Sequence, residues 1–155
     1  MKKLRMPLPK QDLRQLLRAK RASIPSAEQL SAANHININA SQLACFTRAK
    51  NIAAYWSNDG EISTEPLLQT IIHQKKNCYL PVLLLDAKQQ LGFASYTPNT
   101  PLVKNRYGIL EPDLNIAYMC SLGDLDIVFV PLVGFDESGH RLGRGGGFYD
   151  ATFAN

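Results

Sequence analysis

The sequence predicts an α/β domain, a three-layer sandwich around a mostly parallel central sheet. Short apolar runs alternate along the chain with segments of helical periodicity. The run Asp126–Phe135 is continuously apolar between its ends, which is typical of a strand buried on both faces of a parallel sheet. At 155 residues, 45% hydrophobic and 19% charged, the chain can build one sizeable core. We therefore expect residues 1–155 to form a single Rossmann-like domain, with N-terminal helices packed on the sheet.

The first helix is expected from Lys10 to about Ser23. It follows an arm, residues 1–9, that should be disordered because Pro7 and Pro9 break any helix. Cations at i, i+4, i+8 and i+11 share one face of this helix: Lys10, Arg14, Arg18 and Arg21. Such a face is either simply solvated or a clamp for an anion. Stacked like charges slightly destabilise a helix unless an anion or an acid neutralises them.

The remaining elements alternate as an α/β fold requires. A second helix is expected from Ser26, and another after Thr64, where a proline falls in the first turn. The predicted strands are Asn51–Ser57, Cys78–Leu85, Leu91–Tyr96 and Asp126–Phe135. The last of these is the strongest strand prediction and should be central and parallel. Residues 97–125, punctuated by prolines, are expected to be irregular.

Charge and composition exclude several classes of protein. The net charge is +4, but eight of the 17 basic residues lie within residues 1–21, and the rest of the chain is net negative. The basicity is therefore a local arm and not a nucleic-acid surface. Three widely spaced cysteines make neither a disulfide framework nor a zinc site. The longest apolar run falls far short of the ~20 residues of a membrane span, and we expect a cytoplasmic protein.

The segment Gly139–Asp150 is the strongest functional signal in the residues themselves. Five of the ten glycines fall within Gly139–Gly147, between a predicted strand and a predicted helix. Glycine-exposed N–H groups in that position favour phosphates. The spacing matches neither the Walker motif nor the dinucleotide fingerprint, so it leaves the ligand unidentified. Asp150 is equally consistent with a Mg²⁺ ligand and with an acid at the start of a helix.

Four stretches, in order, resemble the 5-formyltetrahydrofolate cyclo-ligase family, also called methenyltetrahydrofolate synthetases. The most specific is Arg-Leu-Gly-Arg-Gly-Gly-Gly-Phe-Tyr-Asp at Arg141–Asp150, after the strand ending Val130–Asp136. The others are Lys10–Arg14, Tyr55–Ser57 with Glu61–Thr64, and Gly108–Pro112. The resemblance covers the chain from about Lys10 to its end. It implies ATP- and Mg²⁺-dependent conversion of 5-formyltetrahydrofolate to 5,10-methenyltetrahydrofolate, with release of ADP and phosphate.

The resemblance also assigns residues by position. ATP would be held by Lys10, Arg14, Arg141, Leu142, Gly143, Arg144, Gly145, Gly146, Gly147, Phe148 and Tyr149. The reduced folate would contact Trp56, Glu61, Arg144, Gly145, Gly146, Gly147 and Phe148. Arg144 and Lys10 are the expected catalytic residues, and Asp150 is the expected Mg²⁺ ligand. Without the resemblance, Glu61 is most simply a surface acid after a turn, and Trp56 a core residue of the first strand.

The resemblance carries further expectations about the whole protein. The family continues for several tens of residues beyond this motif, so we expect the domain to be incomplete at its C-terminus. A monomer is expected, with dimerisation possible, and neither nucleic acid nor membrane is an expected partner. Two alternatives stay open: a non-catalytic nucleotide- or nucleic-acid-binding module, and a folate-binding relative without turnover. Steep salt dependence would mark nucleic-acid binding, and tight folate binding without ATP hydrolysis would mark the non-catalytic relative.

Overall fold

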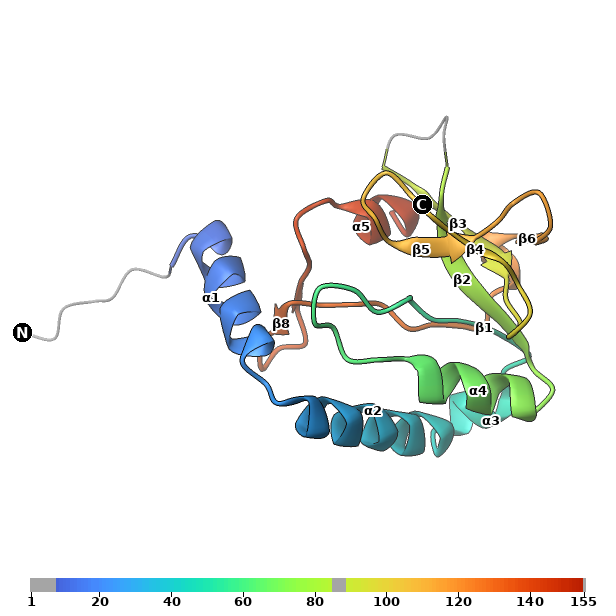
Figure 1. The fold of residues 1–155 in the computed structure, drawn as a ribbon, viewed down its shortest axis with the longest axis horizontal. Coiled ribbons are helices and arrows are strands. Elements are labelled where there is room, and N and C mark those ends of the chain that lie inside the picture. Colours follow the sequence, from blue (N-terminus) through green and yellow to red (C-terminus); the bar gives the residue numbers. More distant parts are fainter. Residues whose placement is uncertain (1–7, 85–88, 155) are drawn as a thin grey trace, which may run out of the picture.

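The computed structural model describes residues 8–84 and 89–154 (Figure 1). Residues 1–7, most of the arm that was expected to be disordered, lie outside the described residues. Leu85, the last residue of a predicted strand, also lies outside them. A five-stranded sheet forms the centre of the molecule. Its strands lie in the order β6 (Met119–Cys120), β3 (Leu91–Ser95), β2 (Asn77–Leu83), β1 (Asn51–Ala53) and β7 (Ile127–Val128).

The sheet is mixed and not mostly parallel, which corrects one part of the predicted fold class. β1 runs parallel to both β2 and β7, whereas β3 runs antiparallel to both β2 and β6. The short connection between β2 and β3 explains the difference. A parallel crossover needs about a dozen residues or more, whereas an antiparallel pair needs only a turn. The α/β class itself is confirmed.

The apolar run 126–135 is not a central strand, contrary to the prediction. In the five-stranded sheet, only Ile127 and Val128 of this run pair in register, and they pair with β1 alone, so β7 is the last strand in the described sheet order. Phe129 still donates its N–H to the carbonyl of Ala53 at 2.8 Å. Pro131 has no N–H to continue the ladder. The apolar character serves instead to pack the chain against the core, where Phe129 lies 6.4 Å from the ring of Phe46.

Helices cover one face of the sheet, and a different layer covers the other (Figure 1). The helical face holds α2 (Ser26–Ser41), α3 (Ala44–Arg48) and α4 (Glu65–His73), with α2 packed on α4. Between them and the sheet lies the core, which includes the fully buried Phe46, Ile52, Leu67, Leu68, Ile71 and Leu80. On the opposite face, the hairpin of β4 (Leu102–Lys104) and β5 (Leu110–Pro112) packs on β2, and α5 (Phe148–Thr152) packs on β3. A 3₁₀ turn, η1 (Leu122–Asp124), follows β6.

The first helix, α1 (Lys10–Ala22), stands beside the sheet and not on it (Figure 1). Its bounds agree with the prediction, but none of its residues is buried. The expectation that the N-terminal helices pack on the sheet is therefore wrong for α1, while α2 lies on the helical side of the sheet and packs on α4 and α3. Its apolar stripe is narrow, and its long cationic side chains reach loops instead of the core.

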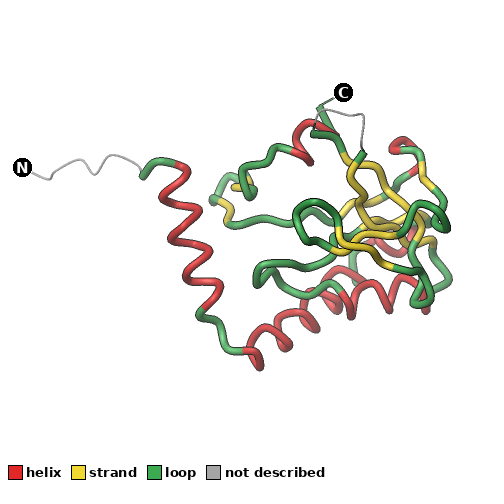
Figure 2. Tube along the Cα trace, turned by 45° about the horizontal axis from the view of Figure 1, so that its top comes forward, coloured by secondary structure: helices red, strands yellow, loops and turns green. Residues whose placement is uncertain are grey.

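Figure 2 shows that the chain between α1 and the sheet is mostly loop, apart from a short hairpin. This hairpin joins β8 (Gly134–Phe135) to β9 (Arg141–Leu142), and the glycine-rich segment, Gly139–Asp150, begins within it. The predicted helix after the glycines is α5, which has only five residues. Within residues 8–84 and 89–154, no helix combines the length and the apolar character needed to cross a bilayer.

Candidate active site

A tight turn at residues 58–61 is the centre of the candidate site. Asp59 and Gly60 both have positive φ, 56° and 73°, and the N–H of Glu61 donates to the carbonyl of Asn58 at 3.1 Å. Positive φ at both central positions is the type I′ pattern, for which Asp-Gly is a favoured pair. The N–H of Asn58 in turn donates to Oε2 of Glu61 at 3.0 Å. These two hydrogen bonds fix the carboxylates of Asp59 and Glu61 on one short turn.

Asp59 receives the cationic face of α1. Its Oδ2 lies 2.8 Å from a guanidinium nitrogen of Arg18 and 3.1 Å from one of Arg21, and Arg21 also donates to its carbonyl at 2.7 Å. A third guanidinium, that of Arg144 from the glycine-rich segment, lies 3.8 Å from the same oxygen. The hydrogen bond from Arg18 is the main reason that the pKa of Asp59 is lowered. The cationic face, for which a solvated surface and an anion clamp were both open, is thus partly neutralised by an acid of the chain itself.

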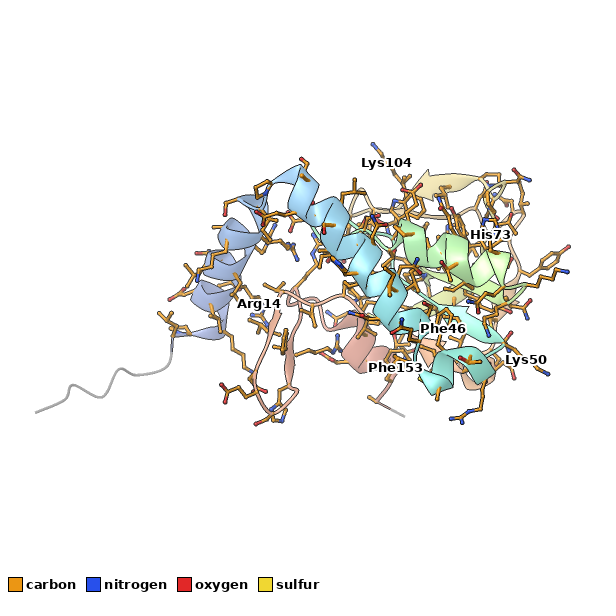
Figure 3. The ribbon with its side chains drawn as sticks, turned by 90° about the horizontal axis from the view of Figure 1, so that it is seen from below. Arg14, Phe46, Lys50, His73, Lys104 and Phe153 are labelled. Atoms are coloured by element: carbon orange, nitrogen blue, oxygen red, sulfur yellow. The ribbon has the colours of Figure 1, made fainter. Side chains whose placement is uncertain are left out.

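Arg14 joins α1 to the glycine-rich segment (Figure 3). Its Nε donates to the carbonyl of Gly143 at 2.8 Å. Its guanidinium also lies against Gly145, where an added Cβ would come within 3.6 Å of it. Gly145 has φ 102° and Gly147 has φ 69°, conformations that side chains with a Cβ rarely adopt. The structure thus brings together two segments that are expected to bind ATP, the part of α1 that contains Arg14 and the glycine-rich segment.

Glu61 is buried, with 8% of its surface exposed. Burial raises the pKa of its carboxyl above the ordinary value of 4.5, against the lowering effects of the Asn58 N–H and of Arg144 and Arg21. Its Oε1 is buried and meets no hydrogen-bond partner among the described residues. The simpler interpretation of Glu61 as a surface acid is therefore wrong. A buried, unpaired carboxylate oxygen is costly and needs an explanation such as a ligand.

Two tyrosines surround Glu61. The hydroxyl of Tyr55 donates to the carbonyl of Ile62 at 2.9 Å, and burial, followed by the charge of Glu61, raises the pKa of Tyr55 to about 12. Burial also raises the pKa of Tyr149, and again the charge of Glu61 is the next cause. Tyr149 thus reaches from the glycine-rich segment to the neighbourhood of the turn. Its ring also lies 5.8 Å from the guanidinium carbon of Arg141.

Asp150 and Arg141 form an ion pair at the outer side of this segment. The carboxylate of Asp150 is 77% exposed, so water and a metal ion can reach it. No group of three or more histidine, cysteine, aspartate or glutamate side chains gathers at one point within the described chain. One accessible carboxylate still suits Mg²⁺, which commonly takes one or two protein carboxylates and completes its shell with phosphate oxygens and water.

Phe148 and Trp56, the two aromatic residues expected to contact the folate, lie at different places in the structure. Phe148 makes an edge-on contact with Tyr107, whose ring centre is 5.7 Å away, and Tyr107 comes from the turn between β4 and β5. Gly146 allows this position of Phe148, because an added Cβ would lie 3.0 Å from the Phe148 ring. Trp56 packs edge-on against Tyr96 at 6.0 Å, on the border of the core. Trp56 thus has a packing role, and any contact with a ligand is a separate prediction.

The other predicted residues flank this arrangement. Leu142 is half-buried in β9, where its carbonyl accepts the N–H of Val133 at 2.7 Å. Lys10 is exposed at the start of α1, and no ion pair or side-chain hydrogen bond holds it among residues 8–84 and 89–154. A cleft of about 780 Å³ opens on the other side of the turn, between α2 and α4, and Glu61 is part of its lining.

Sequence reasoning missed Asp59, Tyr55 and Tyr107 as members of this arrangement. A signal for Asp59 was present in the Asn-Asp-Gly turn and in the unmatched cations of α1. Tyr55 lies in a quoted motif, but nothing in the sequence indicates that its hydroxyl faces the carbonyl of Ile62. Tyr107 meets Phe148 only because the β4–β5 hairpin and α5 cover the same face of the sheet.

Comparisons with known proteins identify the family. The sequence profile of the 5-formyltetrahydrofolate cyclo-ligase family matches residues 8–155. The 5-formyltetrahydrofolate cyclo-ligase of Haemophilus influenzae is 47% identical over 146 residues, which are 94% of this chain and 78% of that protein. The enzyme of the same name from Escherichia coli K12 is 45% identical over 107 residues, 69% of this chain and 59% of the relative's length.

Solved structures agree with this similarity. The 5,10-methenyltetrahydrofolate synthetase of Aquifex aeolicus superposes with a TM-score of 0.78 at 28% identity, covering 93% of this chain and 71% of that one. A 5,10-methenyltetrahydrofolate synthetase from Mycoplasma pneumoniae, at 19% identity and a TM-score of 0.74, shares the fold over 96% of this chain and 79% of its own. Four motifs occur in the family's order, and the family's sequence profile matches the chain over almost its whole length. This chain therefore belongs to the 5-formyltetrahydrofolate cyclo-ligase family.

Proposed function

We propose that this protein cyclises 5-formyltetrahydrofolate to 5,10-methenyltetrahydrofolate in a reaction that consumes ATP, requires Mg²⁺ and releases ADP and phosphate. The family and the relatives' names support the reaction. The observation that carries the assignment to this site is the turn at residues 58–61. It holds Glu61, the expected folate contact, and approaches Arg144, the expected ATP contact, to 3.8 Å through Asp59. The two expected half-sites therefore adjoin.

Glu61 is the centre of the folate half. The edge of a pterin ring presents N–H donors, and the unpaired Oε1 of Glu61 is a buried acceptor in need of one. Its Oε2 is already held by the N–H of Asn58, which fixes the direction of the carboxylate. Phe148 and the backbone of Gly145–Gly147 would adjoin the bound ring, and Arg144 would face its reacting end. Trp56 belongs to this half on the resemblance.

The ATP half combines α1 with the glycine-rich segment. Lys10 and Arg14 come from the helix, and the backbone and side chains of Arg141–Tyr149 come from the other side. A cation about 4 Å from a phosphate oxygen in a part-buried site gains about 4 kcal/mol before desolvation. Several such contacts would hold a triphosphate. The positive φ of Gly145 and Gly147 supports this arrangement, because a segment without Cβ atoms lets phosphates approach the backbone.

Asp150 would hold Mg²⁺ together with the phosphates. Its exposed carboxylate is available for this role, and Arg141, its partner in the ion pair, is itself an expected ATP contact. A polyphosphate binding at Arg141 would therefore compete with Asp150 for the guanidinium and release the carboxylate to the metal. Arg141 and Asp150 would therefore each have a partner of opposite charge, both when the nucleotide is bound and when it is absent.

The chemistry requires positioning and charge stabilisation. An amide oxygen is a weak nucleophile and a very poor leaving group. ATP with Mg²⁺ would supply the phosphoryl group that converts the formyl oxygen into a good leaving group. Arg144 and Lys10 would stabilise charge on the transferring group, and Glu61 would fix the pterin so that its ring nitrogen faces the activated carbon.

A continuous absorbance assay tests the proposal. The protein is mixed with 5-formyltetrahydrofolate, ATP and Mg²⁺, and the methenyl product is followed by its absorbance. We expect product only when all three are present. Tight binding of the folate with no product would favour the folate-binding relative without turnover. The absence of both product and folate binding would contradict the proposed function.

A further inference from the structure

Asp59 occupies a special place in the network of charges around the candidate site. Its Oδ2 contacts three guanidinium groups, two from α1 and one, Arg144, from the glycine-rich segment. Within the described chain, Asp59 is also the acid that pairs with Arg144. Arg144 lies far along the chain from Arg18 and Arg21, and the three cations meet at this oxygen.

The turn makes Asp59 a rigid attachment point. The two hydrogen bonds between Asn58 and Glu61 close the turn, and Asp59 is held in a left-handed conformation at φ 56°. Its side chain is 33% exposed, while that of Arg21 beneath it is only 12% exposed and also donates to the backbone of Asp59. The carboxylate is therefore fixed in position relative to Glu61, two residues further along.

The contact with Arg144 is the loosest of the three. Its distance of 3.8 Å compares with 2.8 Å for Arg18 and 3.1 Å for Arg21. Three guanidinium charges meet one carboxylate, so the cluster keeps an excess of positive charge. Asp59 can therefore orient Arg144 without neutralising the attraction that this cluster has for a polyphosphate.

We propose that Asp59 is a positioning residue, which holds Arg144 beside the folate turn so that the guanidinium is in place before ATP binds. This inference rests on the proposed function. It deepens that function by linking the ATP half of the site to the turn that carries Glu61. Because the phosphates meet a guanidinium that is already oriented, they do not lose affinity to the freezing of a long, mobile side chain.

Two other roles predict different results. If Asp59 served only to attach α1, its loss would lower stability and could weaken ATP binding through Lys10 and Arg14, but that effect would be the same with and without Arg144. If Asp59 competed with phosphate for Arg144, its loss would make ATP bind more tightly, as simple Coulombic repulsion between anions also predicts. Only the positioning role predicts weaker ATP binding that depends on the presence of Arg144.

Asp59→Asn is the direct test, because asparagine tolerates φ 56° and removes only the charge. We expect the dissociation constant of ATP, measured by equilibrium titration, to rise about tenfold, the scale of one charge-assisted hydrogen bond. The affinity for the folate should change much less. Glu137→Gln is the control, since Glu137 is exposed on the β8–β9 hairpin and the same charge is lost there. It should leave the ATP affinity unchanged.

A double-mutant cycle shows whether Asp59 acts through Arg144. In an Arg144→Gln background, Asp59→Asn should have almost no further effect on ATP binding. Asp59→Gly provides a second variant, because glycine also forms the turn, and it should weaken ATP binding equally. Unchanged or tighter ATP binding in either variant, or effects that multiply in the cycle, would overturn the inference. The titration requires no turnover, so wild-type protein that binds ATP but forms no product would count against the proposed function alone.

Discussion

The Nε of Arg14 donates to the carbonyl of Gly143 at 2.8 Å, and this hydrogen bond joins the first helix to a segment 129 positions further along the chain. The contact explains how α1 is held although none of its residues is buried. Arginines provide the attachment, through Arg14 to the glycine-rich segment and through Arg18 and Arg21 to Asp59. Of these three arginines, Arg14 is itself expected to bind the nucleotide.

Arg14→Gln should loosen α1 locally and leave the core intact. A part-buried hydrogen bond from a charged group contributes about 1.5–3 kcal/mol, so amide hydrogen exchange in α1 should accelerate accordingly. Lys20→Gln, an exposed position on the same helix, removes the same charge and should have little effect. Equal exchange rates in the two variants would show that Arg14 does not hold the helix.

Gly145→Ala should destabilise the glycine-rich segment, whereas Gly143→Ala should not. Gly145 has φ 102° and lies against Arg14, while an added Cβ at Gly143 meets nothing within 4 Å. A side chain at such a φ costs about 1–3 kcal/mol. Thermal unfolding compares the two variants, and equal melting temperatures would argue against the left-handed conformation of Gly145.

Glu61→Gln should stabilise the protein at neutral pH while it weakens folate binding. Burial raises the pKa of Glu61 above 4.5, so the folded state binds the proton more tightly than the unfolded state. The stability that this group contributes is complete below that ordinary value and is lost as the pH rises through the raised pKa. Glutamine carries no charge at any of these pH values, so the variant does not lose this stability as the pH rises.

The stabilising effect of Glu61→Gln should therefore be greater at neutral pH than in acid, and it should shrink as the solution is acidified. Thermal unfolding of both proteins across the acidic and neutral range checks this. Folate affinity should fall about tenfold or more, since one charge-assisted hydrogen bond is lost. A variant less stable than the wild type at neutral pH would mean that the charge of Glu61 is better satisfied than the structure indicates.

Arg144→Ala should weaken ATP binding much more than it lowers stability. Among residues 8–84 and 89–154 the guanidinium pairs only with Asp59, at 3.8 Å, and a partly exposed pair of this kind contributes about 0–1 kcal/mol to folding. Loss of a phosphate contact should cost about tenfold or more in ATP affinity. Arg48→Ala, an exposed position on α3, is the matched control. Unchanged ATP affinity with a lowered melting temperature would reverse this assignment.

Local signals explain which parts of the fold could be predicted. Proline before α1 and a narrow leucine stripe were enough to give its bounds, and Cys78–Leu83 and Leu91–Ser95 are strands as expected. The position of α1 could not be predicted in the same way. Its place depends on hydrogen bonds to residues more than a hundred positions away. The spacing of apolar and charged residues shows which side chains share a face of a helix, but it does not show which part of the chain that face contacts.

The prediction of a central strand at residues 126–135 was wrong for a related reason. The composition of Ile127–Phe135 indicates burial, which the chain obtains by packing Phe129 on Phe46 and not by pairing on both sides. In the site, the resemblance selected Arg14, Glu61 and the glycine-rich segment, and the structure brings these together. Asp59 was not selected, because its importance depends on three arginines that converge only in the folded chain.

The most direct measurement of the central claim is the stoichiometry of ATP use. With ATP labelled in its γ-phosphate, labelled inorganic phosphate and methenyl product are quantified in the same reaction. We expect equal amounts of the two, with both abolished or strongly slowed in Arg144→Ala and Glu61→Gln and unaffected in Arg48→Ala. Methenyl product formed without ATP, or phosphate released without product, would contradict a site in which the turn at residues 58–61 couples the nucleotide to the folate.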